Sequence, residues 1–141
     1  MKKFSEKEID GFVKTLDFSK IEGKLIPVVA VDYKTSEVLM LAFANEEAVR
    51  KSLATGYAHY YSRSRNELWK KGMESGHFQE IQNILIDCDK DTLLLKIKQI
   101  GAACHTGYYT CFFSELEGEK LKTIGKKVFN PDEVYDKNKK K

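Results

Sequence analysis

Proline, glycine and cysteine are scarce in this sequence. Its 141 residues include two prolines, nine glycines and three cysteines, with 42% hydrophobic and 32% charged residues. This composition excludes a fibrous or a disordered chain, and the length is that of one ordinary domain. Three cysteines cannot all pair, so we expect free thiols, which serve as core filler, as a nucleophile or as metal ligands.

Long apolar runs are also missing. None approaches the roughly 18 residues that a membrane span requires, and residues 1–10 are too polar for a signal peptide. We therefore predict a cytoplasmic protein with no membrane partner.

Positive charge is not concentrated in the body of the chain. The formal net charge is +3, but residues 119–141 hold eight lysines and four acidic residues, which leaves 16 basic and 17 acidic residues for 1–118. Nucleic-acid binders carry positive charge on their folded surface, so we predict no nucleic-acid partner. We expect a single domain over residues 1–118 and a basic, partly disordered C-terminal tail over 119–141.

Local patterns predict two short helices and several strands. Ser5 and Glu8 form a capping box before one apolar helical face, and Asn45 and Gly56 mark the ends of a second helix. The expected strands are 26–31, 38–43, 58–62, 78–86, 92–100 and 108–113. Without βαβ alternation, this order predicts a mainly β, α+β-like fold, in which short helices cap a folded or barrel-like antiparallel or mixed sheet.

Three carboxylates lie within five residues, at Asp87, Asp89 and Asp91. A hairpin turn explains them about as well as a cation site does. If the strand continues through them, they share one face, and Cys88 points to the other. A hard ion such as Mg²⁺ takes carboxylate oxygens, whereas thiols suit a softer metal.

Cys104 and Cys111 are separated by a Thr-Gly turn, so their sulfurs can converge, and Cys88 makes three thiols. Core thiols and a zinc site are comparable readings. A catalytic zinc site keeps a position for water, whereas a structural site is closed by a fourth ligand, for which His105 is available. Such a site also needs a base, and His77 and His105 exchange protons near neutral pH.

Residues 62–77 form a long polar segment with two arginines between hydroxyl residues. Arginine holds phosphate through forked hydrogen bonds, an indole stacks on a purine, and small residues admit a ligand close to the backbone. The candidate substrate-binding residues are Ser62, Arg63, Ser64, Arg65, Trp69, Lys71, Ser75 and Gly76.

Taken in order, these motifs resemble phosphoribosyl-AMP cyclohydrolase of histidine biosynthesis. The resemblance covers about residues 39–113 and rests on the strings 62–69, 74–77, 87–91, 103–107 and 111–112. It implies a hydrolase that opens the adenine ring of N1-(5-phosphoribosyl)-AMP at the N1–C6 bond with zinc-activated water. The product is the formimino carboxamide ribotide intermediate.

The same resemblance implies the metal sites and the assembly. Zinc would be bound by Cys88, Cys104 and Cys111, with Cys88 contributed by the opposite subunit of a homodimer, and Mg²⁺ by Asp87, Asp89 and Asp91. The family also occurs fused to a pyrophosphohydrolase, and we expect the single-activity form. His105 or His77 would move the proton of the attacking water, with Glu74 as a second-rank candidate.

The sequence departs from the family at one place, and two other functions, a binding module and a deaminase, are alternatives. Tyr108 and Tyr109 stand where family members usually carry two arginines. A zinc-binding module that presents the arginines to RNA or a nucleotide is opposed by the neutral body of the chain. A deaminase reading lacks the Cys-x-x-Cys pair that such sites use.

Overall fold

The structure is a computed structural model that describes residues 3–132, and both predicted helices are present. Helix α1 (Glu6–Thr15) begins at the Ser5–Glu8 capping box, in which both reciprocal hydrogen bonds form. Helix α2 (Glu46–Thr55) begins at Asn45, whose side chain accepts the Ala48 N–H, and ends at Gly56 in the left-handed conformation. None of the described helices is long and apolar enough to span a membrane.

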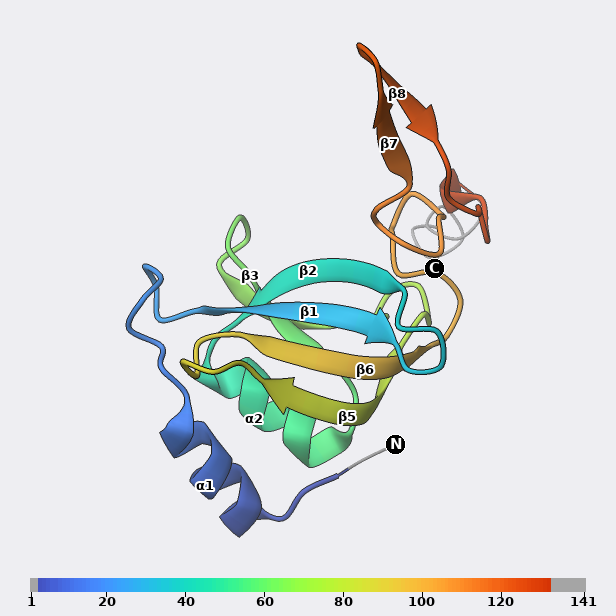
Figure 1. The fold of residues 1–141 in the computed structure, drawn as a ribbon. Helices are drawn as coiled ribbons and strands as arrows, with labels where there is room; N and C mark the ends of the chain where they lie inside the picture. The colour runs from blue at the N-terminus through green and yellow to red at the C-terminus, as the bar shows by residue number, and fades with distance from the viewer. Residues whose placement is uncertain (1–2, 133–141) are drawn as a thin grey trace.

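A four-stranded mixed sheet forms the centre of the fold, with the order β2-β1-β6-β5 (Figure 1). The strands are β1 (Ile26–Asp32), β2 (Val38–Ala44), β5 (Gln79–Ile86) and β6 (Leu93–Gln99). β1–β2 and β5–β6 are antiparallel, whereas β1 and β6 are parallel. β2 and β5 are the two edge strands and do not pair with each other, so the sheet does not close into a barrel, the second of the two expected forms.

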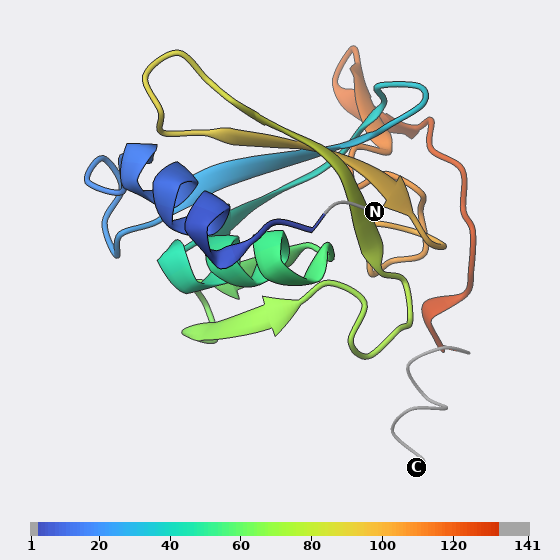
Figure 2. The same cartoon turned by 90° about the horizontal axis from the view of Figure 1, so that it is seen from below.

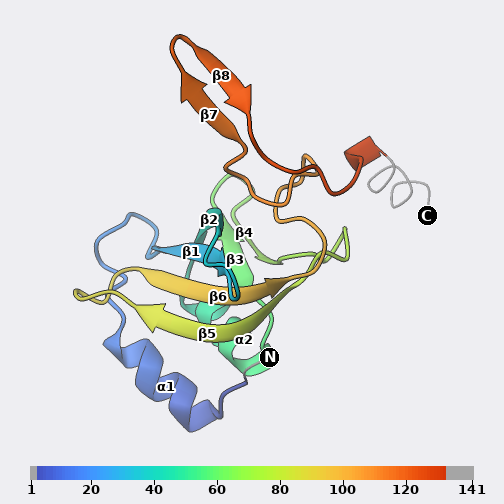
Figure 3. The same cartoon turned by 45° about the vertical axis from the view of Figure 1, so that its right-hand side comes forward.

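Two further hairpins flank this sheet. β3 (His59–Ser62) pairs with β4 (Glu67–Lys70), and β7 (Ser114–Glu117) pairs with β8 (Lys120–Thr123). The β7–β8 hairpin is exposed along its whole length and projects from the body of the protein (Figures 1 and 3). The strand expected over 108–113 is wrong: apart from an isolated bridge at Tyr108, this segment consists of bends and irregular chain, and β7 begins only at Ser114. Of the expected tail, 119–132 include β8, and 133–141 lie outside the described residues.

The hydrophobic core lies between the sheet and the two helices, which lie side by side in Figure 2. Helix α1 contributes Ile9 and Val13, and α2 contributes Val49 and Leu53. Each such aliphatic side chain stabilises the fold by about 1.5–3 kcal/mol when fully buried. They pack on sheet residues that include Ile26, Val28, Leu39, Ile81, Leu93, Leu95 and Ile97.

The antiparallel pairing of β5 with β6 fixes where the chemical motifs lie. Ile86 pairs with Leu93 at one end of the two strands, and Gln79 pairs with Gln99 at the other. Residues 87–92, here called the acidic turn, therefore lie at one end of the sheet. Residues 100–113, here called the thiol segment, lie at the opposite end, about 20 Å away for six residue steps of about 3.3 Å.

Candidate active site

The acidic turn brings three carboxylates together. One oxygen each from Asp87, Asp89 and Asp91 lie within 4.8 Å of one another. They gather through a turn and not along a strand: β5 ends at Ile86, and Asp87 Oδ1 accepts the Asp91 N–H at 3.0 Å. The hairpin turn, one of the two alternatives, is the form adopted, and the continued strand that would put the three carboxylates on one face does not form: Lys90 has a positive φ of 65° and the chain reverses there.

Lys20, which sequence reasoning missed, reaches this cluster from a loop 69 residues away. Its Nζ lies 2.8 Å from Asp89 Oδ2 and 3.2 Å from Asp91 Oδ2. The hydrogen bond from Lys20 lowers the pKa of Asp89 to about 2, and the neighbouring Asp89 raises the pKa of Asp91. The cluster can therefore hold a cation, and in this structure the Lys20 ammonium offsets part of its negative charge.

The thiols of Cys104 and Cys111 face each other in the thiol segment. Cys104 N–H donates to Tyr108 O at 3.1 Å, and Cys111 N–H donates to Leu39 O at 2.7 Å, so a tight turn and the edge strand β2 both hold the segment. Cys104 is buried. Although Cys111 is exposed as a residue, burial of its thiol and the adjacent Cys104 raise its pKa to about 11.

Cys88 does not join this pair within one chain. It is exposed in the acidic turn, at the opposite end of β6 from the thiol segment (Figure 1). The three thiols of a single chain therefore form two separate groups.

Lys71 and His77 border the thiol pair. Lys71 Nζ donates to Ala103 O at 2.5 Å, and burial lowers the pKa of Lys71 while the thiols of Cys111 and Cys104 oppose that shift. His77 Nδ1 accepts the Ala102 N–H at 3.4 Å.

Two glycines leave the space that His77 occupies. A Cβ on Gly101 would lie 2.5 Å from the His77 ring, and a Cβ on Gly72 would lie 2.5 Å from the His77 carbonyl carbon. Burial lowers the pKa of His77. His105 follows Cys104 and is exposed, and Glu74 is also exposed. The three candidates for proton transfer thus come from the thiol segment and the nearby loop 71–78.

The Ser-Arg motif lies elsewhere, at the tip of the β3–β4 hairpin. Ser62 Oγ accepts the Arg65 N–H at 3.2 Å and lies 3.3 Å from Ser64 Oγ. The Arg63 guanidinium lies 4.0 Å from the centre of the Phe43 ring. Because Phe43 pairs with Pro27 at the start of β1, this contact is at the end of the sheet that carries the acidic turn.

The remaining predicted substrate residues have structural partners. Trp69 packs on Tyr60 with ring centres 5.3 Å apart and contacts the core, so one of its faces is already covered. Ser75 Oγ accepts the His77 N–H at 3.2 Å, and Gly76 N–H donates to Gly72 O at 2.7 Å. Ser75 and Gly76 therefore shape the loop that carries His77.

The two tyrosines at the family's arginine positions are engaged in packing. Tyr109 donates its phenol hydrogen to Asp32. The ring of Tyr108 stacks on Phe113 with centres 4.0 Å apart. Both side chains are therefore committed to contacts within the protein.

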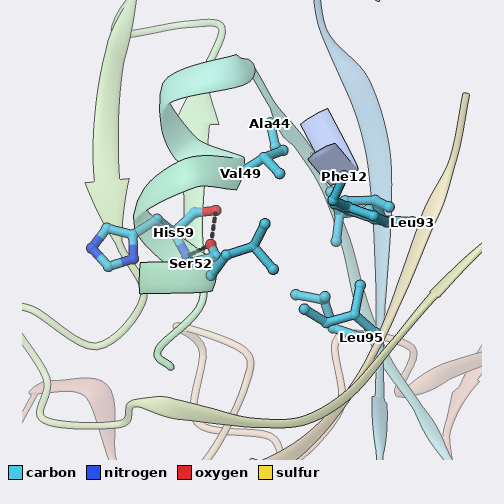
Figure 4. Close-up of a pocket in the computed structure, with 10 residues that line it drawn as sticks. Phe12, Ala44, Val49, Ser52, His59, Leu93 and Leu95 are labelled. Atoms are coloured by element: carbon cyan, nitrogen blue, oxygen red, sulfur yellow. Dashed lines mark hydrogen bonds between the residues drawn. The ribbon is translucent and has the colours of Figure 1, made fainter. Parts of the chain in front are cut away.

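A small cavity in the core is not a binding site. It has a volume of about 10 Å³ and is lined by Val49, Leu93, Leu95 and other apolar residues, with Ser52 and His59 at one side (Figure 4). A space of this size holds at most one water molecule. Ser52 Oγ is committed to the backbone of His59, accepting its N–H at 2.8 Å.

Comparison with known proteins identifies the family. The phosphoribosyl-AMP cyclohydrolase family model matches residues 40–113. The phosphoribosyl-AMP cyclohydrolase of Methanoregula boonei is 61% identical over 116 residues, which are 82% of this chain and 92% of that protein. The corresponding protein of Methanothrix thermoacetophila is 57% identical over 114 residues, which are 81% of this chain and 92% of that protein.

A longer relative is also similar. The histidine biosynthesis bifunctional protein HisIE of Thermoanaerobacter pseudethanolicus is 52% identical over 128 residues, which are 91% of this chain but 58% of that protein. The chain is thus a hydrolase with an α+β fold. It belongs to the phosphoribosyl-AMP cyclohydrolase family, and the matched segment contains both the acidic turn and the thiol segment.

Proposed function

We propose that the chain hydrolyses the N1–C6 bond of the adenine ring in N1-(5-phosphoribosyl)-AMP, the reaction of histidine biosynthesis that gives the formimino carboxamide ribotide. Family membership supports this activity. The observation that carries the chemistry is the facing thiol pair Cys104 and Cys111, bordered by histidines and a buried lysine. In the reaction, water adds to C6, the N1–C6 bond breaks, and N1 gains a proton.

The donor atoms fit the metals that the family implies. Two facing thiols suit a soft ion such as zinc, and three clustered carboxylates suit Mg²⁺. When bound, zinc supplies Lewis acidity that activates water for attack on C6. Cys104 and Cys111 would hold it, and the third thiolate is Cys88.

Cys88 must come from a second copy of the chain. It lies about 20 Å from the thiol pair of its own chain by the length of β6. In a two-fold symmetric dimer each copy offers its acidic turn to the thiol segment of the other, which forms two identical sites. We therefore propose a homodimer, and the cytoplasmic location stays a prediction from the sequence.

His105 is the favoured residue for accepting the proton of water. The Ala102 N–H points at His77 Nδ1, so the neutral His77 ring carries its hydrogen on Nε2 and acts there as a donor. His77 can therefore orient or polarise the purine ring, whereas His105, next to Cys104, is an exposed residue. Glu74 stays a second-rank candidate.

Substrate contacts divide between the two ends of the sheet. Ser62, Ser64 and the guanidinium groups of Arg63 and Arg65 would meet phosphate beside the acidic turn. Ser75 and Gly76 would line the thiol end, and Trp69 has one face covered by Tyr60.

Incubation of the zinc-loaded protein with N1-(5-phosphoribosyl)-AMP tests the function. We expect a change in ultraviolet absorbance and a product heavier by one water molecule. Protein stripped by a chelator should be inactive and should recover with added zinc. Release of ammonia would indicate a deaminase, and unchanged substrate would contradict the proposal.

A further inference from the structure

Lys71 has an environment that differs from that of a surface lysine. It follows β4, and its backbone N–H donates to Ala58 O at 3.1 Å, which fixes the start of the side chain. The ammonium is then turned inward, where Nζ donates to Ala103 O at 2.5 Å. It also lies 5.6 Å from the centre of the Trp69 ring. The Lys71 side chain is therefore fixed both at its backbone and at its ammonium.

The ammonium lies next to the thiol pair, since the carbonyl that it contacts belongs to Ala103, the residue before Cys104. Burial lowers the pKa of Lys71, and the thiols of Cys111 and Cys104 oppose that shift once they are ionised. Burial of a cation is costly unless a nearby anion or strong acceptors compensate it. A single carbonyl does this only in part, whereas two ionised thiols beside it would complete the compensation.

We propose that Lys71 is a positioning residue of the thiol pair: its ammonium holds the Ala103 carbonyl and balances the negative charge that Cys104 and Cys111 carry when they bind a metal ion. This inference rests on the zinc site of the proposed function. Three thiolates around Zn²⁺ give a net charge of −1, and an adjacent ammonium offsets it. The sequence pattern assigns Lys71 to substrate binding, but its donor is directed at the protein backbone and not toward solvent.

Zinc affinity of the metal-free dimer, measured by competition with a chromophoric chelator, tests this role without substrate. We expect Lys71→Met to weaken zinc binding about 10- to 100-fold, as loss of a partner that orients a ligand does. Lys71→Arg, which keeps the charge and a donor, should recover most of that loss. Lys70→Met is the matched control, since Lys70 lies over the Tyr57 and Phe78 rings, and we expect wild-type zinc affinity from it.

Cobalt(II) substitution gives a second readout. Lys71→Met should shift or weaken the thiolate-to-cobalt absorption band, and Lys70→Met should not. If Lys71→Met does not fold, Lys71→Gln provides the uncharged comparison. The ring-opening rate of the wild type is measured separately, so an inactive wild type that binds zinc refutes the proposed reaction and leaves the affinity comparison intact.

Three results would overturn the inference. Unchanged zinc affinity in Lys71→Met with a raised KM and a normal kcat would make Lys71 a substrate ligand. Unchanged zinc affinity with only a lower melting temperature would make it a packing residue. Failure of the wild type to bind zinc would remove the site that Lys71 is proposed to serve.

Discussion

Mixing two inactive variants should restore activity if each zinc site uses thiols from two chains. Thiols that share one zinc ion lie within about 4 Å of one another, given zinc–sulfur bonds of about 2.3 Å. Cys88 and the thiol pair of the same chain are separated by about 20 Å along β6. No side-chain rotation closes that gap, so Cys88→Ala and Cys104→Ala damage opposite halves of each composite site.

The expected magnitude follows from two-fold symmetry. In a heterodimer of these variants, one site carries both lesions and the other carries none. Random exchange between equal amounts of the two variants makes about half of the dimers mixed. Each mixed dimer has one intact site of its two, so the mixture should reach about one quarter of wild-type activity. The assay is the ring-opening rate at saturating zinc after joint refolding, with subunit exchange shown by a size tag on one variant.

A mixture of Cys104→Ala with Cys111→Ala is the matched control. Both lesions fall in the same half-site, so no heterodimer has an intact site, and the mixture should stay inactive. If tagged heterodimers of Cys88→Ala and Cys104→Ala form and show no activity, Cys88 does not complete the thiol pair of another copy, and the shared site is refuted.

Three further perturbations test the histidines and the glycine that supports one of them. His105→Ala should lower kcat about 10²- to 10⁴-fold, and His77→Ala should lower kcat less than His105→Ala does. A loss of kcat under tenfold in His105→Ala with normal zinc content would exclude His105 as the base. Gly72→Ala should lower the free energy of unfolding by about 1–3 kcal/mol more than Gly76→Ala. Both glycines have a positive φ, so backbone strain is common to the two variants, but a Cβ at Gly72 would meet the His77 backbone whereas one at Gly76 meets nothing within 4 Å. Equal losses in urea unfolding would show that the His77 backbone moves aside freely. Burial lowers the pKa of His59 from 6.5, so in acid the unfolded chain takes up more protons than the folded one, and the free energy of unfolding should be full above about pH 6.5 and fall as the pH drops below it. The melting temperature of His59→Gln should therefore depend less on pH over this range. Profiles of melting temperature against pH that run parallel for the wild type and His59→Gln would contradict this role of His59.

The parts of the fold that sequence predicts are those with local causes. The Ser5 capping box, the Asn45 cap and the Gly56 terminator act within one helical turn, and all three are confirmed. The strands that were missed have no such cause. β4 is a four-residue strand inside a charged run, and β7 and β8 are exposed on both faces, so apolar alternation does not mark them.

The false strand at 108–113 shows the limit of residue preference. Tyrosine, threonine and phenylalanine favour extended chain, but a strand also needs a neighbour that pairs in register. Here the hydrogen bonds go to separate partners: Tyr109 N–H donates to Lys126 O, and Cys111 N–H donates to Leu39 O. These partners lie far away in the sequence, so no local pattern reveals them.

The candidate site is predictable in its residue types but not in its arrangement. Asp87, Cys88 and Cys104 are recognisable from spacing, yet their arrangement depends on β6 (Leu93–Gln99), the strand that lies between Cys88 and Cys104 and that the sequence predicts over 92–100. That strand puts Cys88 and Cys104, which are 16 residues apart in sequence, at opposite ends of the sheet, so a single chain holds two incomplete halves of the proposed thiol site. Two lysines also have partners that the motifs do not indicate. Lys71 lies in a motif but donates to the thiol segment, whereas Lys20 lies in no motif and forms ion pairs with Asp89 and Asp91 of the acidic turn. A cation must displace Lys20 to occupy the three carboxylates, so a Lys20→Met variant should bind Mg²⁺ more tightly than the wild type. Equal affinities in a calorimetric titration would mean that the ammonium is only a loose surface partner of the cluster.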